Sequence, residues 1–156
     1  MKTDLFVSVI APLENDRNII EPFLREVSLV LRENFTYYEI VLVDNNSTDG
    51  TVEVVAALLS KMPGLRMIRL SREFDLDVAI SAGLDSCIGD FVVVMIPECD
   101  PPNLIPDLVD RCRHGAGVVT GIKSKIPANG LVRRLFAGIF HWYTKQFLNL
   151  DLIPGM

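Results

Sequence analysis

Short apolar runs rich in β-branched residues alternate along this chain with longer segments of helical periodicity. This alternation constrains the fold more than any other feature, because strands that alternate with helices form a parallel sheet covered by helices. Strands are predicted at 5–11, 38–44, 65–70, 89–97 and 117–122. Helices are predicted at 18–34, 50–62, 77–87, 102–113 and 131–149. The sequence therefore predicts an α/β fold with a mainly parallel sheet and helices on both faces.

The size and charge of the chain narrow the class of protein. A length of 156 residues suits one domain, and we expect residues 1–156 to form it. The formal charge of -5 disfavours nucleic acid as a partner. No run approaches the roughly 20 apolar residues that span a bilayer, and no signal peptide is visible, so we expect a cytoplasmic protein with reduced thiols.

Polar clusters follow the first four predicted strands, each at the point where the strand ends. They read PLEND, DNNSTDG, SREFDLD and ECDPP. Ligands of parallel α/β sheets bind outside the carboxyl ends of the strands, so this edge is the expected binding site. Neither GxGxxG nor GxxxxGK[ST] occurs in the chain, which disfavours a dinucleotide fold and a P-loop ATPase.

Taken one at a time, these clusters leave two interpretations open. In the cluster Asp44-Asn45-Asn46-Ser47, the acid either accepts hydrogen bonds from a base or ribose, or the cluster only caps the helix that follows. Arg72 either forms a fork onto a phosphate or is a solvated surface cation. Glu98 and Asp100 have the spacing of two oxygen ligands for Mg²⁺ or Mn²⁺ beside a diphosphate, although acids before a proline turn are common.

The predicted helix 131–149 interleaves basic residues with aromatic ones. Such an amphipathic helix either lies in a bilayer interface or packs on the protein's own sheet. The first interpretation predicts a peripheral contact with the inner face of a membrane, and the second predicts an ordinary core helix. The residues of this segment favour neither.

Four stretches in order resemble glycosyltransferase family 2, whose members are inverting enzymes with the GT-A nucleotide-diphospho-sugar-binding fold. The stretches are VSVIAPLENDRNI, YEIVLVDNNSTDGT, IRLSREFDLDVAISAGLD and GDFVVVMIPECDPPNLIPDL. The resemblance runs from Phe6 to about Lys145 and is strongest to the dolichol- or polyprenyl-phosphate sugar transferases. It implies transfer of a hexose from a UDP- or GDP-linked donor to a polyprenyl phosphate or glycan acceptor.

The resemblance also implies which residues form the site. Those assigned to the donor are Pro12, Leu13, Glu14, Asp16, Asp44, Asn46 and Arg72. Within this set Arg72 is expected to face the phosphates. Glu98 and Asp100 are the implied ligands of Mg²⁺ or Mn²⁺, and the resemblance assigns no catalytic residue within this chain.

The segment IPECDPP departs from the family's Asp-x-Asp pattern. It is one residue shorter, which places Ile96 at the first Asp, Glu98 at the second and Asp100 at the Gln that often joins the metal. One carboxylate of the pattern is therefore lost. This departure leaves an alternative function, a non-catalytic nucleotide-sugar-binding module of the same fold.

Overall fold

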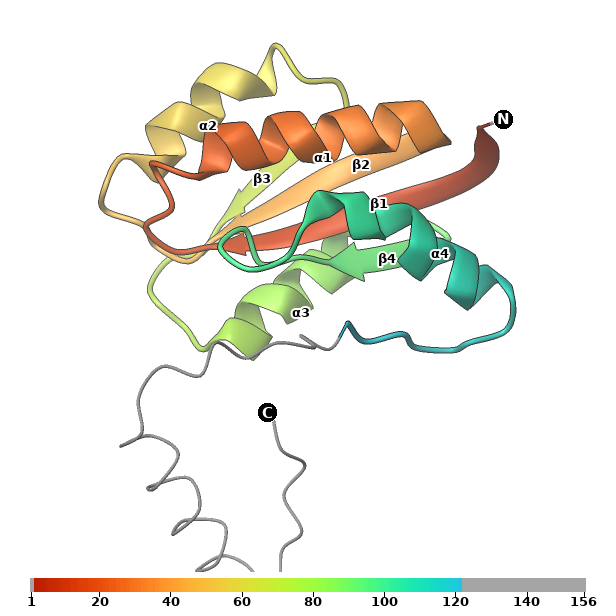
Figure 1. The fold of residues 1–156 in the computed structure, drawn as a ribbon. Coiled ribbons are helices and arrows are strands. Elements are labelled where there is room, and N and C mark those ends of the chain that lie inside the picture. The colour runs from red at the N-terminus through yellow and green to blue at the C-terminus, as the bar shows by residue number, and fades with distance from the viewer. Residues whose placement is uncertain (1, 122–156) are drawn as a thin grey trace, which may run out of the picture. The chain divides into compact units, whose positions relative to one another are not determined.

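The computed structural model describes residues 2–121 of the chain (Figure 1). The chain divides into two compact units, Met1–Val119 and Thr120–Met156. The fold described below is that of the first unit. The predicted helix 131–149 lies outside the described residues.

Four parallel strands form the sheet of this unit. The strands are β1 (Thr3–Leu13), β2 (Phe35–Asp44), β3 (Leu65–Arg69) and β4 (Phe91–Val94). Their order in the sheet is β3-β2-β1-β4, and every pairing between neighbours is parallel. Parallel neighbours require a crossover between them, which the helices supply. The first four predicted strands and the mainly parallel sheet are thus confirmed.

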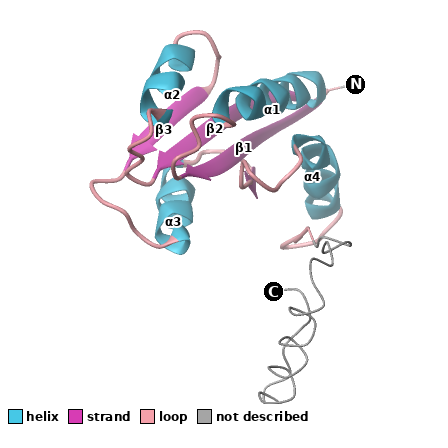
Figure 2. Cartoon of the chain, turned by 60° about the vertical axis from the view of Figure 1, so that its left-hand side comes forward, coloured by secondary structure: helices cyan, strands magenta, loops and turns pink. Residues whose placement is uncertain are grey.

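Helices cover both faces of the sheet, as predicted. They are α1 (Ile20–Asn34), α2 (Thr51–Leu59), α3 (Leu76–Ser86) and α4 (Ile105–Arg113), the last preceded by a 3-10 turn at Pro102–Leu104. Helices α1, α2 and α4 lie on one face, and α3 lies alone on the other (Figures 1 and 2). Within residues 2–121 no helix is long and apolar enough to cross a membrane.

The alternation of side chains along the strands builds a core on each face. On the α1 face, Val9 and Leu42 belong to the larger cluster of fully buried residues. On the α3 face, Ile10 and Val43 pack against that helix. Gly83 lets α3 approach closely, because a Cβ at this position would collide with Ile10. The close approach of α3 fixes one wall of the site described below.

The fifth predicted strand is wrong over 117–121, where the structure has no strand. Val118 is 86% exposed, and among residues 2–121 this short apolar run has no ladder partner. Strand β4 is also shorter than predicted, and its Val92 and Val94 are each 38% exposed. Among the described residues, the α3 face of the sheet is therefore not fully covered at β4.

Candidate functional site

The loops after β1 and β2 are joined to each other at the carboxyl edge of the sheet. The backbone N–H of Asn45 donates to the Leu13 carbonyl (2.8 Å), and that of Thr48 donates to Oδ1 of Asn15 (3.0 Å). Asn15 and Asn46 have φ values of 59° and 60°, in the left-handed region that asparagine tolerates better than most residues. The asparagines of these loops thus set the backbone of the site.

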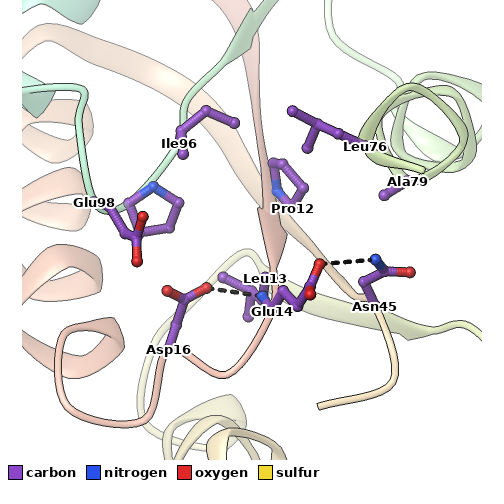
Figure 3. Close-up of a pocket in the computed structure, with 10 residues that line it drawn as sticks. Pro12, Leu13, Glu14, Asp16, Asn45, Leu76, Ala79, Ile96 and Glu98 are labelled. Carbon is purple, nitrogen blue, oxygen red and sulfur yellow. Dashed lines mark hydrogen bonds between the residues drawn. The ribbon is translucent and has the colours of Figure 1, made fainter. Parts of the chain in front are cut away.

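A pocket of about 290 Å³ opens at this edge, between α3 and the loop after β4 (Figure 3). The residues that line it are Pro12, Leu13, Glu14, Asp16, Asn45, Leu76, Ala79, Ile96, Pro97 and Glu98. The predicted site residues Pro12, Leu13, Glu14, Asp16 and Glu98 are therefore brought together. They come from the ends of β1 and β4, which are neighbours in the sheet.

The charge of this pocket is negative. Glu14, Asp16 and Glu98 contribute carboxylates, and the described lining includes no lysine, arginine or histidine. Like charges repel one another, and the repulsion grows as solvent is excluded from between them. A phosphate-bearing ligand would therefore need a cation to accompany it into the pocket.

Asp16 is the most buried of the three acids, with 6% of its surface exposed. Its Oδ2 accepts a hydrogen bond from the backbone N–H of Glu14 (2.9 Å). Burial raises the pKa of the Asp16 carboxyl above its usual 3.8; the hydrogen bond opposes this, and the charge of Glu98 adds to the rise. Asp16 and Glu98 are thus close enough to repel each other.

The raised pKa predicts a pH-dependent effect of Asp16→Asn on stability. The folded state holds the Asp16 proton more tightly than the unfolded state, so wild-type stability falls as pH rises from 3.8 through the raised pKa. Asparagine keeps an acceptor for the Glu14 N–H but has no proton to lose. We expect the variant to match wild type at about pH 3 and to be the more stable protein at about pH 7. Urea unfolding at both pH values measures this, and a variant that loses stability at the higher pH contradicts it.

Asn45 lines the pocket, although it was not among the residues assigned to the donor from the sequence. Its Oδ1 accepts from the Phe74 N–H (2.9 Å), and its Nδ2 donates to the Phe74 carbonyl (2.8 Å) and to Oε2 of Glu14 (3.1 Å). One amide side chain therefore joins the loop after β3 to the loop after β1 and holds the Glu14 carboxylate at the pocket wall (Figure 3). The sequence signal was its place beside Asp44 at a strand end.

Asp44 does not line the pocket. Its side chain is fully buried, its Oδ1 accepts from the Ser47 N–H (3.2 Å), and its Oδ2 lies 3.3 Å from Nε of Arg69. That Oδ2 is buried and has no hydrogen bond to any of the described residues. In this structure Asp44 shapes the turn after β2 and does not cap α2, whose N-cap residue is Gly50.

The other predicted residues also lie outside the pocket lining. Asn46 and Arg72 are exposed, and the guanidinium of Arg72 lies over the Phe74 ring, 4.7 Å from its centroid. Asp100 is half-buried, and its Oδ2 accepts from the backbone N–H of Ile96 (2.8 Å). The hydrogen bond commits one oxygen of Asp100 to the turn between β4 and α4.

The acids of the pocket fit one mode of metal binding. Within residues 2–121, no three His, Cys, Asp or Glu side chains gather in a metal-binding arrangement. Mg²⁺, however, is commonly held by one or two carboxylates together with the phosphates of a substrate. Glu98, with Asp16 close by, offers that donor set. The residues present therefore fit a cation that binds together with a phosphorylated ligand. They do not form a site that would hold a cation by protein ligands alone.

The fold and the pocket define an α/β domain with an acidic ligand site at the carboxyl edge of a parallel sheet. Comparison with known proteins makes this class specific, because residues 8–152 match the profile described as Glycosyl transferase family 2. The chain belongs to glycosyl transferase family 2.

Curated relatives extend the comparison. The chain is 35% identical over 116 residues to a dolichol-phosphate mannosyltransferase from Pyrococcus furiosus, covering 74% of this chain and 32% of the relative. It is 34% identical over 122 residues to an undecaprenyl-phosphate 4-deoxy-4-formamido-L-arabinose transferase from Pseudomonas savastanoi pv. phaseolicola, covering 76% of this chain and 36% of the relative. Over 153 residues it is 24% identical to YkcC, an uncharacterized glycosyltransferase from Bacillus subtilis, covering 97% of this chain and 47% of the relative. The chain thus spans less than half the length of these relatives.

Solved structures agree with the fold. The mannosyltransferase PcManGT from Pyrobaculum calidifontis, in complex with GDP-Man and Mn²⁺, superposes with a TM-score of 0.57 at 26% identity, over 62% of this chain and 28% of that one. The mannosyl-3-phosphoglycerate synthase from Rubrobacter xylanophilus superposes with a TM-score of 0.65 at 19% identity, over 94% of this chain and 49% of that one. Both confirm the predicted GT-A fold.

Proposed function

We propose that this chain carries the donor-binding part of a glycosyltransferase that moves a hexose from a UDP- or GDP-linked donor to a polyprenyl phosphate or glycan acceptor. The observation that carries the proposal is the acidic pocket of about 290 Å³ at the carboxyl edge of the sheet, in a chain of family 2. Pro12, Leu13 and Glu14 would receive the nucleoside, and Glu98 lies where the diphosphate would enter. The GDP-Man and Mn²⁺ in PcManGT support a donor of this kind.

A divalent cation would neutralise the diphosphate in this pocket. The described pocket lining supplies no positive side chain, so the charge of a bound diphosphate requires a partner. Glu98 is the residue best placed to hold Mg²⁺ or Mn²⁺, and Asp16 is a second acid close to Glu98. Arg72 would have to leave the Phe74 ring to reach a phosphate.

For the acceptor we favour a lipid phosphate, because two relatives are named for transfer to dolichol phosphate and undecaprenyl phosphate. An oxygen of such a phosphate would form the new bond to the anomeric carbon of the sugar while the bond to the nucleoside diphosphate breaks. At neutral pH a phosphate monoester is already ionised, since its second pKa is about 6. Its oxygen therefore needs no protein base, which agrees with a site to which no base is assigned.

Calorimetric titration of the chain with GDP-mannose and UDP-glucose tests the donor site. We expect binding in the presence of Mn²⁺ and much weaker binding in EDTA, because the cation neutralises the pocket. The test of transfer is incubation with radiolabelled donor and a polyprenyl phosphate in detergent. A chain that binds neither nucleotide-sugar at millimolar concentration contradicts the proposal.

One observation favours the alternative function. Of the three residues at the family's metal-binding positions, Ile96 contributes an apolar side chain to the pocket and Asp100 is hydrogen-bonded to the turn. Only Glu98 therefore offers a free carboxylate to the pocket. A nucleotide-sugar-binding module without catalysis would have the same arrangement. Binding of the donor without transfer to any lipid phosphate or glycan would support this module.

A further inference from the structure

The pocket has two chemically different ends. In the view of Figure 3, Asp16 and Glu98 lie to the left of Pro12 and Ala79 lies to its right, while the Glu14 side chain lies below Pro12 with its carboxylate directed toward Asn45. The first end has two mutually repelling acids, which suit a cation with a diphosphate. The second end has a single carboxylate beside apolar walls. An uncharged, flat part of a ligand fits the second end better than a phosphate does.

The carboxylate at the second end is held in place. Oε2 of Glu14 accepts from Nδ2 of Asn45 (3.1 Å), and Asn45 is itself fixed by two hydrogen bonds to the Phe74 backbone. An ionised carboxylate accepts hydrogen bonds at both oxygens and has no proton to donate. The Glu14 side chain is exposed, so its remaining acceptor positions are open to a ligand. The pocket at Glu14 therefore favours a ligand group that donates hydrogen bonds.

Nucleobases differ in how many donors they present side by side. Guanine carries N1–H and the 2-amino group next to each other, a pair that matches the two oxygens of a carboxylate. Uracil and thymine present a single N–H between two carbonyl oxygens, which a carboxylate repels. Adenine and cytosine present an amino group next to a ring nitrogen that accepts. Only guanine offers two neighbouring donors and no acceptor between them.

We propose that Glu14, held by Asn45, makes this pocket selective for a guanine nucleotide, with the Watson–Crick edge of the base on the Glu14 carboxylate. The inference rests on the proposed function and narrows its donor to a GDP-linked sugar. The base would lie against the apolar walls at Pro12, Leu76 and Ala79. Its diphosphate would then extend toward Glu98.

Calorimetry of the chain with nucleoside diphosphates in Mn²⁺ tests this selectivity. We expect wild type to bind GDP about tenfold or more tightly than UDP, CDP or ADP, as for a bidentate contact to a base edge. Inosine diphosphate lacks the 2-amino group and should fall between GDP and UDP. Glu14→Gln should bring GDP within about threefold of UDP, because glutamine offers one acceptor and presents an N–H to the base. Glu73→Gln, a matched change at an exposed acid outside the pocket lining, should leave the GDP preference intact.

The outcomes distinguish a failure of guanine selectivity from a failure of the proposed donor-binding function. If UDP binds wild type as tightly as GDP, or if Glu14→Gln weakens all nucleotides equally, guanine selectivity is overturned and the donor site remains. If no nucleotide binds wild type, the proposed function fails and the selectivity with it. Thermal unfolding of each variant verifies that a lost preference does not come from a lost fold.

Discussion

Glu39→Ala is expected to lower the free energy of unfolding by about 1 to 3 kcal/mol, the cost of leaving hydrogen-bond donors around a buried carboxylate without their acceptor. The Glu39 side chain is 7% exposed and lies in β2. Its Oε1 accepts from the Ser8 hydroxyl (2.7 Å) and the Ile88 N–H (2.9 Å), and its Oε2 accepts from Nε of Arg66 (3.0 Å). Alanine would leave the buried Ser8 hydroxyl without its acceptor, whereas the half-exposed Arg66 and the N–H of the exposed Ile88 could turn to water.

Glu39→Ala is also expected to disturb the pocket. The Ser8 hydroxyl that Glu39 binds also accepts from the Gly89 N–H (2.9 Å), and Arg66 donates to the Ser86 carbonyl (2.7 Å). The network therefore fixes the connection between α3 and β4, and the pocket lies between α3 and the loop that follows β4. We expect donor binding to weaken in the variant even where it remains folded.

Urea unfolding with two companion variants measures the contribution of Glu39. Glu39→Gln keeps an acceptor for Ser8 and Ile88 but loses the charge opposite Arg66, so its loss of stability should be smaller than that of Glu39→Ala. Glu33→Ala removes an exposed acid at the end of α1 and should stay within about 0.5 kcal/mol of wild type. A Glu39→Ala protein as stable as Glu33→Ala would show that the network contributes nothing.

The sheet could be predicted because its information is local. Each of the first four strands is an apolar run followed by a polar turn, and parallel pairing follows once helices separate the strands. The segment 117–121 has the same local pattern, yet it pairs with no strand in the part of the chain that the structure describes, and Val118 lies exposed. Pairing is a tertiary property, so an apolar run alone could not distinguish this segment from a strand.

The site could be predicted in outline for the same reason. Carboxyl ends of parallel strands meet at one edge, which brought Glu14, Asp16 and Glu98 together. The direction of each side chain was harder to predict. Asp44 continues the face of β2 that carries Ile40 and Leu42, so it turns toward α1 and α2 and is buried there. The alternation of side chains along β2 predicts that Asp44 lies on the same face as Ile40 and Leu42. It does not predict on which face of the sheet the pocket opens.

Two contacts that the sequence did not indicate join segments that are distant along the chain. Asn45 reaches Phe74, which lies 29 residues further along the chain, and Glu39 reaches Ile88, which lies 49 residues further along. Neither pair has a spacing that a motif or a periodicity reveals. Polar residues inside or beside an apolar strand are the only local sign, because an unpaired polar group in such a place would be costly.

Glu98→Gln is expected to remove most of the advantage that Mn²⁺ gives to donor binding. Glu98 is exposed at the pocket mouth, one oxygen of Asp100 is committed to Ile96, and the described pocket lining has no cation of its own. Loss of a charged ligand from so small a donor set should weaken Mn²⁺-dependent binding by about 10- to 100-fold. Binding in EDTA, where no cation is bridged, should hardly change.

The measurement is calorimetry of GDP-mannose and UDP-glucose with and without Mn²⁺, for wild type, Glu98→Gln and Asp100→Asn. Asp100→Asn keeps an acceptor for the Ile96 N–H and should reduce the metal dependence less than Glu98→Gln. Because Glu98 is exposed, its variant should also unfold within about 0.5 kcal/mol of wild type, which separates a metal ligand from a structural residue. If Glu98→Gln keeps the full difference between Mn²⁺ and EDTA, its carboxylate is not a ligand. Asp16 would then be the acid that remains to hold the cation at this end of the pocket.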